Sequence, residues 1–299
     1  MPLDDFLRVL DSVAAKTDPH GVFVILSGGE PLLRDDIEAC GRAIYDRGFP
    51  WGMVSNGFAL TPERFKGLLK AGMHSVTISL DGLEQEHNWM RGHSESFERV
   101  DRAISLLTAA QRLTYDIVTC VNRRNYGQLT AIKDYLISKG VSNWRIFTVF
   151  PVGRAANDPD MRLTDEEFRG VFQFIRQCRQ EGCLHVSYGC EGFLGNYEGE
   201  VRDHLFSCQA GITIGSVLVD GSISACTSIR ADYHQGNIYK DDFMEVWENR
   251  YAAYRHREWM RTDECADCQY FRYCQGNGMH LRDGDGKLLL CHLHRLQET

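Results

Sequence analysis

Five short and continuously apolar runs most constrain what this chain can fold into. They cover residues 22–27, 51–55, 75–80, 115–121 and 144–150. A strand with no polar face has to be buried on both sides, as in a parallel sheet that helices cover. Helical patterns separate the runs, and an earlier one has an apolar face of Leu3, Phe6, Leu7, Leu10 and Val13. This alternation predicts right-handed crossovers and a parallel sheet that is curved or closed.

Capping residues mark two of the helix starts. Residues 61–63 (Thr-Pro-Glu) and 164–167 (Thr-Asp-Glu-Glu) each place a cap residue before acids in a first turn. The strand–helix pattern fades after the second of these helices, around 163–180. We therefore place a domain boundary near 185–205, which divides the chain into residues 1–185 and 186–299.

The second part is rich in glycine and cysteine and has one hairpin signal. In residues 216–225, Asp220-Gly221 lies between two stretches that alternate apolar and polar residues. This pattern predicts two antiparallel strands joined by a two-residue turn.

Polar residues and glycines follow all five apolar runs. They are Gly28-Gly29-Glu30, Ser55-Asn56-Gly57, Ser79-Leu80-Asp81-Gly82, Asn122-Arg123-Arg124-Asn125 and Gly153-Arg154. In parallel α/β folds, ligands bind at the carboxyl ends of the strands. A tight turn would explain Gly28-Gly29 alone, but five such ends together favour a binding site.

Eleven cysteines are present, and six of them crowd the C-terminal third: Cys208, Cys226, Cys265, Cys268, Cys274 and Cys291. In a reducing compartment, clustered cysteines favour metal over disulfides, and an odd count also argues against a disulfide framework. Short loops such as Cys265-x2-Cys268-x5-Cys274 aim three thiolates at one point. The spacing by itself permits a structural zinc or an iron–sulfur cluster.

Charge and composition exclude several classes of protein. The net charge is −8, so no basic field is available to collect phosphates, and we expect no nucleic-acid partner. No run of about 18 apolar residues occurs, and the first residues lack the basic and apolar regions of a signal peptide. We expect a cytoplasmic chain that does not associate with a membrane.

The motifs together resemble the radical S-adenosylmethionine (radical SAM) enzymes. The resemblance rests on "SGGEPLLR" (27–34), "SNG" (55–57), "SLDG" (79–82), "MRG" (90–92) and "PVGRA" (151–155), which occur in the family's order. It implies a TIM-like partial barrel of six β/α units. It also implies that Gly28, Gly29, Glu30 and Pro31 bind the amino group of the cofactor's methionine part. Ser55, Ser79 and Arg91 would then contact its ribose and carboxylate.

The C-terminal cysteines resemble the SPASM domain, which follows many radical SAM barrels and carries auxiliary iron–sulfur clusters. By this resemblance Cys265, Cys268, Cys274 and Cys291 ligate one [4Fe–4S] cluster. A further cluster would use Cys208 and Cys226, but Gly278 stands where the family has another cysteine. Candidates to complete that site are Cys190, His204 and His280. We interpret Cys40, Cys120, Cys178 and Cys183 as small core residues.

One family motif is absent from the chain. Radical SAM enzymes carry a Cys-x3-Cys-x2-Cys loop after the first barrel strand, and the 27 residues before Gly28 contain no cysteine. We expect the first barrel strand and its cluster loop to be missing, and with them the radical-generating cluster. Between a shortened chain and a degenerate relative we favour the shortened chain, because the cofactor-side residues are intact.

The resemblance implies an enzyme in its full-length form. Such an enzyme cleaves S-adenosylmethionine reductively to a 5′-deoxyadenosyl radical and modifies a substrate, commonly a peptide or protein, with electrons from a donor such as flavodoxin or ferredoxin. The subgroup that fits best is one encoded beside a lipoprotein. The alternative is a non-catalytic binding protein with one structural four-cysteine metal site. Residues 88–92 and 188–200 line a substrate cleft or pack in the core; no general base is identified.

Overall fold

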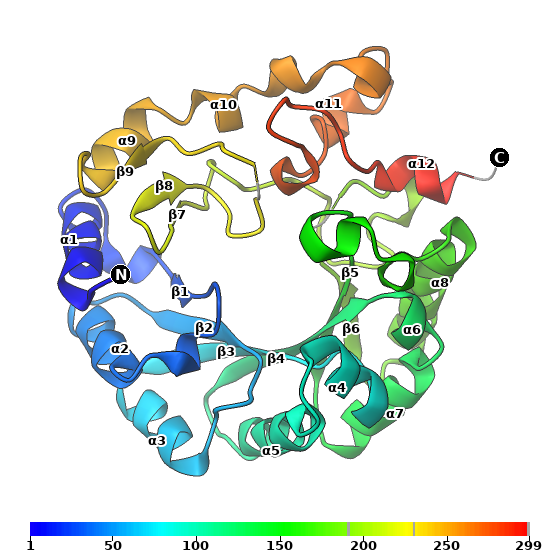
Figure 1. Ribbon diagram of the computed structural model, residues 1–299, viewed down its shortest axis with the longest axis horizontal. Helices are drawn as coiled ribbons and strands as arrows, with labels where there is room; N and C mark the ends of the chain where they lie inside the picture. The colour runs from blue at the N-terminus through cyan, green and yellow to red at the C-terminus, as the bar shows by residue number, and fades with distance from the viewer. Residues whose placement is uncertain (190–191, 230, 298–299) are drawn as a thin grey trace.

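Six strands form one parallel sheet in the computed structural model, which describes residues 1–189, 192–229 and 231–297. The strands are β1 (Val24–Leu26), β2 (Trp51–Ser55), β3 (Met73–Ser79), β4 (Thr114–Val121), β5 (Asn143–Thr148) and β6 (His185–Tyr188). They pair in chain order, each with the next, so β1 and β6 are the two edges. The sheet curves into an arc (Figure 1), as expected for a partial TIM-like barrel.

Helices cover the outer side of the arc (Figure 1). They are α1 (Leu3–Ala14), α2 (Ile37–Asp46), α3 (Pro62–Lys70), α4 (Glu84–Arg91), α5 (Ser96–Thr108), α6 (Arg123–Tyr126), α7 (Leu129–Ser138) and α8 (Asp165–Glu181). The two predicted helix starts are confirmed. Thr61 Oγ1 accepts from the Arg64 N–H at 3.2 Å, and Thr164 forms a reciprocal capping box with Glu167.

Buried aromatic side chains fix the distance between sheet and helices. The Trp51 ring lies directly against Gly41 of α2, where any side chain would overlap it. Its indole N–H donates to the Ala71 carbonyl at 3.1 Å, so this large side chain is buried without an unpaired polar atom. This packing holds β1 and β2, whose carboxyl ends carry the first predicted motifs, against α2.

The predicted strands all form, with small differences at their ends, and one further strand was missed. β6 pairs with β5 in the register Trp144↔Val186 and extends the parallel sheet to Tyr188. Its sequence, His-Val-Ser-Tyr, is short and alternates polar and apolar residues, unlike the other runs. The division into residues 1–185 and 186–299 stays a prediction.

Short elements and turns make up the C-terminal region. Its strands are β7 (Ser216–Val217), β8 (Ser222–Ser224) and β9 (Gly236–Asn237), which form a small antiparallel sheet. Its helices are α9 (Phe243–Asn249), α10 (Ala252–Arg255), α11 (Phe271–Cys274) and α12 (His292–Leu296). Several 3-10 turns lie between them, including η6 (Arg257–Met260), η7 (Asp263–Cys265) and η8 (Met279–Leu281). Most of its apolar side chains form a hydrophobic cluster separate from the barrel core.

The predicted hairpin joins β7 and β8, but its turn is longer than predicted. The Leu218 N–H donates to the Ser222 carbonyl, and the Gly221 N–H donates back to the Leu218 carbonyl, both at 2.9 Å. Three residues therefore form the loop. Gly221 closes it with a φ of 85°, a left-handed conformation that glycine adopts without strain.

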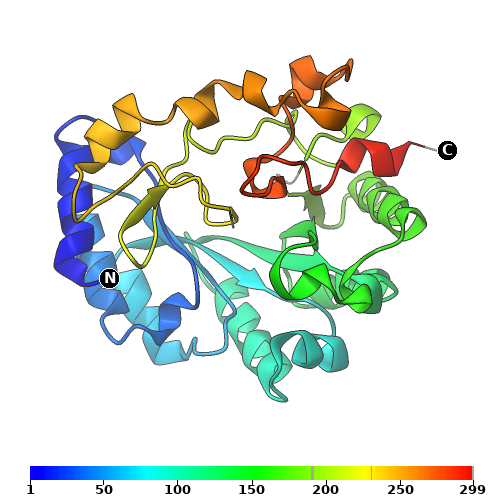
Figure 2. The same cartoon turned by 45° about the horizontal axis from the view of Figure 1, so that its top comes forward.

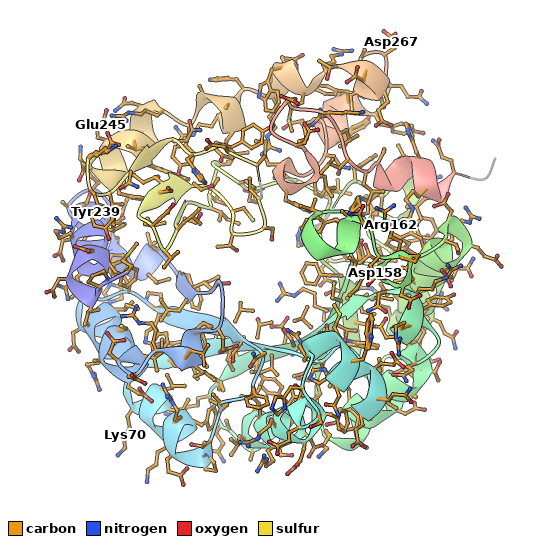
Figure 3. The ribbon with its side chains drawn as sticks, viewed as in Figure 1. Lys70, Asp158, Arg162, Tyr239, Glu245 and Asp267 are labelled. Atoms are coloured by element: carbon orange, nitrogen blue, oxygen red, sulfur yellow. The ribbon has the colours of Figure 1, made fainter. Side chains whose placement is uncertain are left out.

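The C-terminal region closes the ring that the sheet leaves open. Figures 1 and 2 both place α9 beside α1 and α12 beside α8. The Tyr239 hydroxyl (labelled in Figure 3) donates to Asp5 of α1 at 3.0 Å. At the other end Arg295 of α12 pairs with Asp165 of α8 at 2.7 Å. Among the described residues, no helix combines the length and apolar character needed to cross a membrane.

Candidate functional site

The two glycines after β1 lie at an open edge of the sheet. Gly28 and Gly29 both have positive φ values, 78° and 50°, which residues with a Cβ rarely adopt. A Cβ at either position would meet no atom within 4 Å, so the backbone here faces open space. Pro31 then begins a 3-10 turn, η2 (Pro31–Leu33), whose first two residues are buried and which leads the chain toward α2. A ligand can approach this backbone closely.

The Glu30 carboxylate is held in place by three donors. Its Oε1 accepts from the Ser55 hydroxyl at 2.7 Å and from the Leu32 N–H at 3.0 Å. Its Oε2 accepts from the Asn56 N–H at 2.8 Å. A carboxylate has about four lone-pair positions, so one remains for a ligand. The neighbouring strands β1 and β2 thus fix Glu30 in a single orientation.

The structure places Ser55 as a support for Glu30. Ser55 is 2% exposed, and its Oγ donates to Glu30 while accepting from the Gly57 N–H at 3.0 Å. Both hydrogen-bonding roles of the hydroxyl are therefore used inside the protein. Ser79 ends β3 on the same edge of the sheet and is half-buried.

Arg91 is tied to the end of β3 by a buried acid. Its Nη2 lies 2.6 Å from Asp81 Oδ2, and Asp81 is only 2% exposed. The other carboxylate oxygen of Asp81 accepts from the Cys120 N–H at 3.0 Å, which links β3 to β4. This charge-assisted pair fixes the position of the Arg91 guanidinium, which is about one third exposed.

A cavity of about 440 Å³ adjoins these groups. It is lined by Asn56, Phe58, His87, Trp89, Met90, Arg91, Gly92, His93 and Ser96. Asn56 connects it to Glu30, because its backbone N–H donates to that carboxylate. The cavity therefore includes four of the five residues in 88–92, one of the two stretches predicted to line a cleft or to pack.

His87 is a neutral donor in this cavity. Its Nδ1 accepts from the Asp81 N–H at 3.0 Å, so the ring proton is on Nε2. Burial lowers the pKa of His87 to about 4, and the nearby Asp81 carboxylate offsets this only in part. The imidazole is uncharged at neutral pH.

In the C-terminal region, four cysteines line one small cavity: Cys265, Cys268, Cys274 and Cys291. They come from η7, from the loop after it, from the last residue of α11 and from the residue before α12. The structure thus brings together the four cysteines that were predicted to ligate one cluster. Among the described residues, no three His, Cys, Asp or Glu side chains lie close enough to hold a single metal ion.

Burial makes the thiols of Cys265, Cys274 and Cys291 hard to ionise on their own. Desolvation raises the pKa of Cys274 to about 12 and that of Cys291 to about 11. Burial also raises the pKa of Cys265, where the Arg282 guanidinium opposes the shift. The Arg282 Nη2 atom lies 3.4 Å from the Cys265 sulfur. Four buried or half-buried cysteines around one cavity, with a cationic hydrogen-bond donor beside them, fit an iron–sulfur cluster, whose positive core would stabilise the thiolates.

The other predicted metal ligands do not line this cavity. Cys208 and Cys226 are half-buried against the C-terminal hydrophobic cluster, and the Cys208 carbonyl accepts from Arg257 at 3.0 Å. His204 is exposed, and His280 packs edge-on to Phe150. Cys190 lies outside the described residues, as does the Arg154 side chain.

The remaining cysteines were predicted to be core residues. Cys40 and Cys178 are buried, at 4% and 2% exposure, and confirm the prediction, whereas Cys120 is half-buried. The prediction was wrong for Cys183, which is exposed because it follows the C-terminal end of α8, where the chain turns at the surface.

No role was predicted for Asp81, His87 or Arg282. Asp81 lies within the quoted "SLDG", so its place after a strand was a usable signal. His87 and Arg282 have no motif of their own, and their roles follow from contacts between segments distant in sequence.

Comparison with known proteins yields two family matches. Residues 1–136 match the model of the radical SAM superfamily, and residues 208–269 match that of an iron–sulfur cluster-binding domain, SPASM. The second match includes Cys208, Cys226, Cys265 and Cys268. The two families bring with them S-adenosylmethionine and [4Fe–4S] clusters as cofactors.

Relatives of known function share about a quarter of their residues with this chain. An AdoMet-dependent heme synthase of Methanosarcina barkeri is 26% identical over 291 residues, which are 91% of this chain and 81% of the relative. The mycofactocin maturase MftC of Mycolicibacterium smegmatis is 28% identical over 266 residues, 86% of this chain and 66% of the relative.

Solved structures share the fold. The structure of anSMEcpe with bound AdoMet and a Cp18Cys peptide has a TM-score of 0.73 at 19% identity, covering 99% of this chain and 86% of that one. Streptococcus suis SuiB bound to its precursor peptide SuiA has a TM-score of 0.68 at 16% identity, covering 95% and 64%. The strand order, the motifs and both family matches agree: residues 1–136 form a radical SAM domain and residues 208–269 a SPASM iron–sulfur cluster-binding domain.

Proposed function

We propose that this protein is a radical SAM enzyme that modifies a peptide or protein. S-adenosylmethionine supplies, after one-electron reduction, the 5′-deoxyadenosyl radical that takes a hydrogen atom from the substrate. The residues of this chain bind and orient that cofactor at the carboxyl edge of the sheet. Flavodoxin or ferredoxin is the proposed class of electron donor.

The observation that carries the proposal is the arrangement of Glu30. Its carboxylate is oriented by Ser55, Leu32 and Asn56 and keeps one lone-pair position open, next to a glycine backbone that faces free space. An ammonium group needs carboxylate and carbonyl oxygens aimed at it from several sides. The Glu30 carboxylate and the backbone carbonyls of Gly28 and Gly29 would supply these oxygens to the amino group of the cofactor's methionine part.

Arg91 is the proposed partner of the methionine carboxylate. The pairing with Asp81 uses Nη2 and leaves other guanidinium N–H groups on the side of the cavity. A planar guanidinium binds a carboxylate through two parallel hydrogen bonds. Ser55 would act through Glu30, and Ser79 is proposed to contact the ribose from the next strand end.

A peptide substrate is supported by the names of several relatives. They include the mycofactocin maturase MftC and a PqqA peptide cyclase of Rhizobium meliloti, which is 22% identical. Three of the similar solved structures contain a peptide. Heme synthases are also among the relatives, so a porphyrin is the competing substrate class.

A [4Fe–4S] cluster is proposed for Cys265, Cys268, Cys274 and Cys291. A zinc ion holds all four sulfurs at about 2.3 Å from one point, whereas each cysteine around a cluster binds a different iron. The four thiols line one cavity without three of them converging on a single metal position among the described residues, which supports the cluster. Cys208 and Cys226 stay proposed ligands of a further cluster, with partners not identified.

Cofactor binding tests the role of Glu30. Replacing Glu30 by Gln keeps the shape but removes the charge, and a charge-assisted hydrogen bond of about 1.5–3 kcal/mol corresponds to a roughly ten- to hundredfold loss of affinity. Titration calorimetry with S-adenosylmethionine measures this. Glu63→Gln is the matched control, because Glu63 is exposed in the first turn of α3. Equal affinities of wild type and Glu30→Gln would refute the assignment. Absence of binding by the wild type would favour the non-catalytic alternative.

A further inference from the structure

A fully buried arginine lies beside the four-cysteine cavity. Arg282 is 2% exposed, and its guanidinium contacts three separate loop segments. Nε and Nη2 donate to the Gly276 carbonyl, both at 3.1 Å, and Nη2 also donates to the Met260 carbonyl at 3.0 Å. Nη1 donates to the Gly286 carbonyl at 2.6 Å. The remaining contact of Nη2 is the Cys265 sulfur at 3.4 Å.

Within the part of the chain that the structure describes, no carboxylate pairs with this buried charge. Among the described residues, every hydrogen-bond partner of Arg282 is a backbone carbonyl or a sulfur, and no Asp or Glu oxygen lies within ion-pair distance of it. The nearby Asp283 instead accepts from the backbone N–H groups of Asp285 and Lys287. A buried guanidinium without an anion is costly. The thiolates of the adjacent cavity are the anions available to it.

From this contact we infer that Arg282 is a positioning residue that raises the reduction potential of the C-terminal cluster through its buried positive charge. The inference rests on the proposed [4Fe–4S] site. Four thiolates on a cluster of charge +2 leave the site with a net charge of −2, and one-electron reduction makes it −3. A cation beside one sulfur favours that added negative charge. The electron comes from an external reductant, and no proton moves, because guanidinium keeps its proton in proteins.

A merely structural role for Arg282 is the alternative. Its hydrogen bonds hold η6, the loop after α11 and the turn at Gly286 together, and this alone would explain its burial. Only an electrostatic role of the Arg282 charge, however, predicts a change in the reduction potential of a cluster that is still bound. Variants that separate charge from hydrogen bonding distinguish the two explanations.

The test is a redox titration of the reconstituted 299-residue protein, followed by electron paramagnetic resonance. Arg282→Gln keeps donors but removes the charge, and we expect the ratio of reduced to oxidised cluster at a fixed potential to fall about tenfold, which is ~59 mV for one electron. Arg282→Lys keeps the charge and should stay within about threefold of wild type. Arg261→Gln is the control: Arg261 donates to Ala266 in the same loop but is exposed, so its loss should leave the potential unchanged.

Each outcome decides the matter. A wild type that binds zinc, or iron without sulfide, would overturn the proposed cluster and this inference with it. A cluster-bearing Arg282→Gln with the wild-type potential would overturn only the role of Arg282, and so would an equal tenfold fall in Arg282→Lys. If Arg282→Gln loses the cluster and Arg282→Lys retains it at the wild-type reduction potential, the result supports a role for the positive charge. If neither variant retains the cluster, Arg282 has a merely structural role and the inference is overturned.

Discussion

The strand-edge site around Glu30 and the four-cysteine cavity are supported in different ways. Glu30 follows β1 and is hydrogen-bonded to the end of β2, so its position is set by the register of a six-stranded sheet. The cysteines lie on one 3-10 turn, on a four-residue helix and in loops, where only local turn hydrogen bonds and no sheet register set their spacing. We therefore expect the first site to be formed before its ligand binds, and the second to depend on the proposed cluster for its order.

The two sites therefore differ in how much of the cofactor's binding energy is used to order the protein. At the strand edge, the fold already orients the Glu30 carboxylate, so a bound ammonium group would gain the full electrostatic interaction without ordering the protein. In the cysteine cavity, thiols with raised pKa values must lose their protons and the loops must be ordered, so much of the binding energy is folding energy. The following predictions test this contrast.

The largest effect expected is a complete absence of S-adenosylmethionine cleavage by the 299-residue chain. Cleavage needs an iron with one open position held by three neighbouring thiolates. Cys40 of α2 and Cys120 of β4 are isolated from each other in sequence and lie on different elements, and the four C-terminal cysteines would fill all positions of their cluster. Dithionite-reduced protein should release no 5′-deoxyadenosine above a control without protein.

A variant with an added N-terminal segment that carries a Cys-x3-Cys-x2-Cys loop provides the positive control for this experiment. It should release 5′-deoxyadenosine even without substrate. Turnover by the 299-residue chain itself would contradict the cluster assignments, and Cys208 and Cys226 would then be the first residues to re-examine.

A large but local effect is expected from removing one ligand of the cysteine cavity. Cys268→Ala should make the C-terminal region protease-sensitive or the protein insoluble, because the metal supplies much of that region's folding energy. Limited proteolysis with mapping of the cleavage sites measures this, and cuts should concentrate between residues 208 and 297. Cys183→Ala, which removes an exposed cysteine, should behave like wild type. A soluble, protease-resistant Cys268→Ala protein would mean that the thiols are merely packed.

Residues whose partners are set by strand order were predictable from the sequence. The apolar runs predicted β1 to β5, and the motif after β1 placed Glu30 at the carboxyl end of that strand. β6 was missed because its alternating polar residues carry no signal of a buried strand. The Arg282 contacts could not be foreseen, because Met260, Gly276 and Gly286 come together only through loops whose paths no local pattern sets.

The smallest effect concerns pH and the strand-edge site, which should lose stability in acid without any metal being involved. The folded-state pKa of His87 is lowered from 6.5 to about 4, mainly by burial, with Asp81 opposing and Arg91 adding to the shift. Between these values the unfolded chain binds more protons than the folded one. This stabilisation is complete above pH 6.5 and is lost as the pH falls toward 4, for a total of about 3 kcal/mol.

Hydrogen exchange of peptides from β2 to β4, followed from pH 7 to pH 4.5 and corrected for intrinsic rates, measures this loss in the barrel separately from the C-terminal region. His87→Gln removes the titration while its side-chain oxygen can still accept from the Asp81 N–H, so its stability should depend less on pH. His74→Gln is the control, because His74 is exposed on β3 and its loss should leave the wild-type pH dependence intact. Equal slopes for wild type and His87→Gln would show that the imidazole is solvated. The cavity next to Glu30 would then be more open than its buried histidine indicates, and the contrast with the cysteine cavity would weaken.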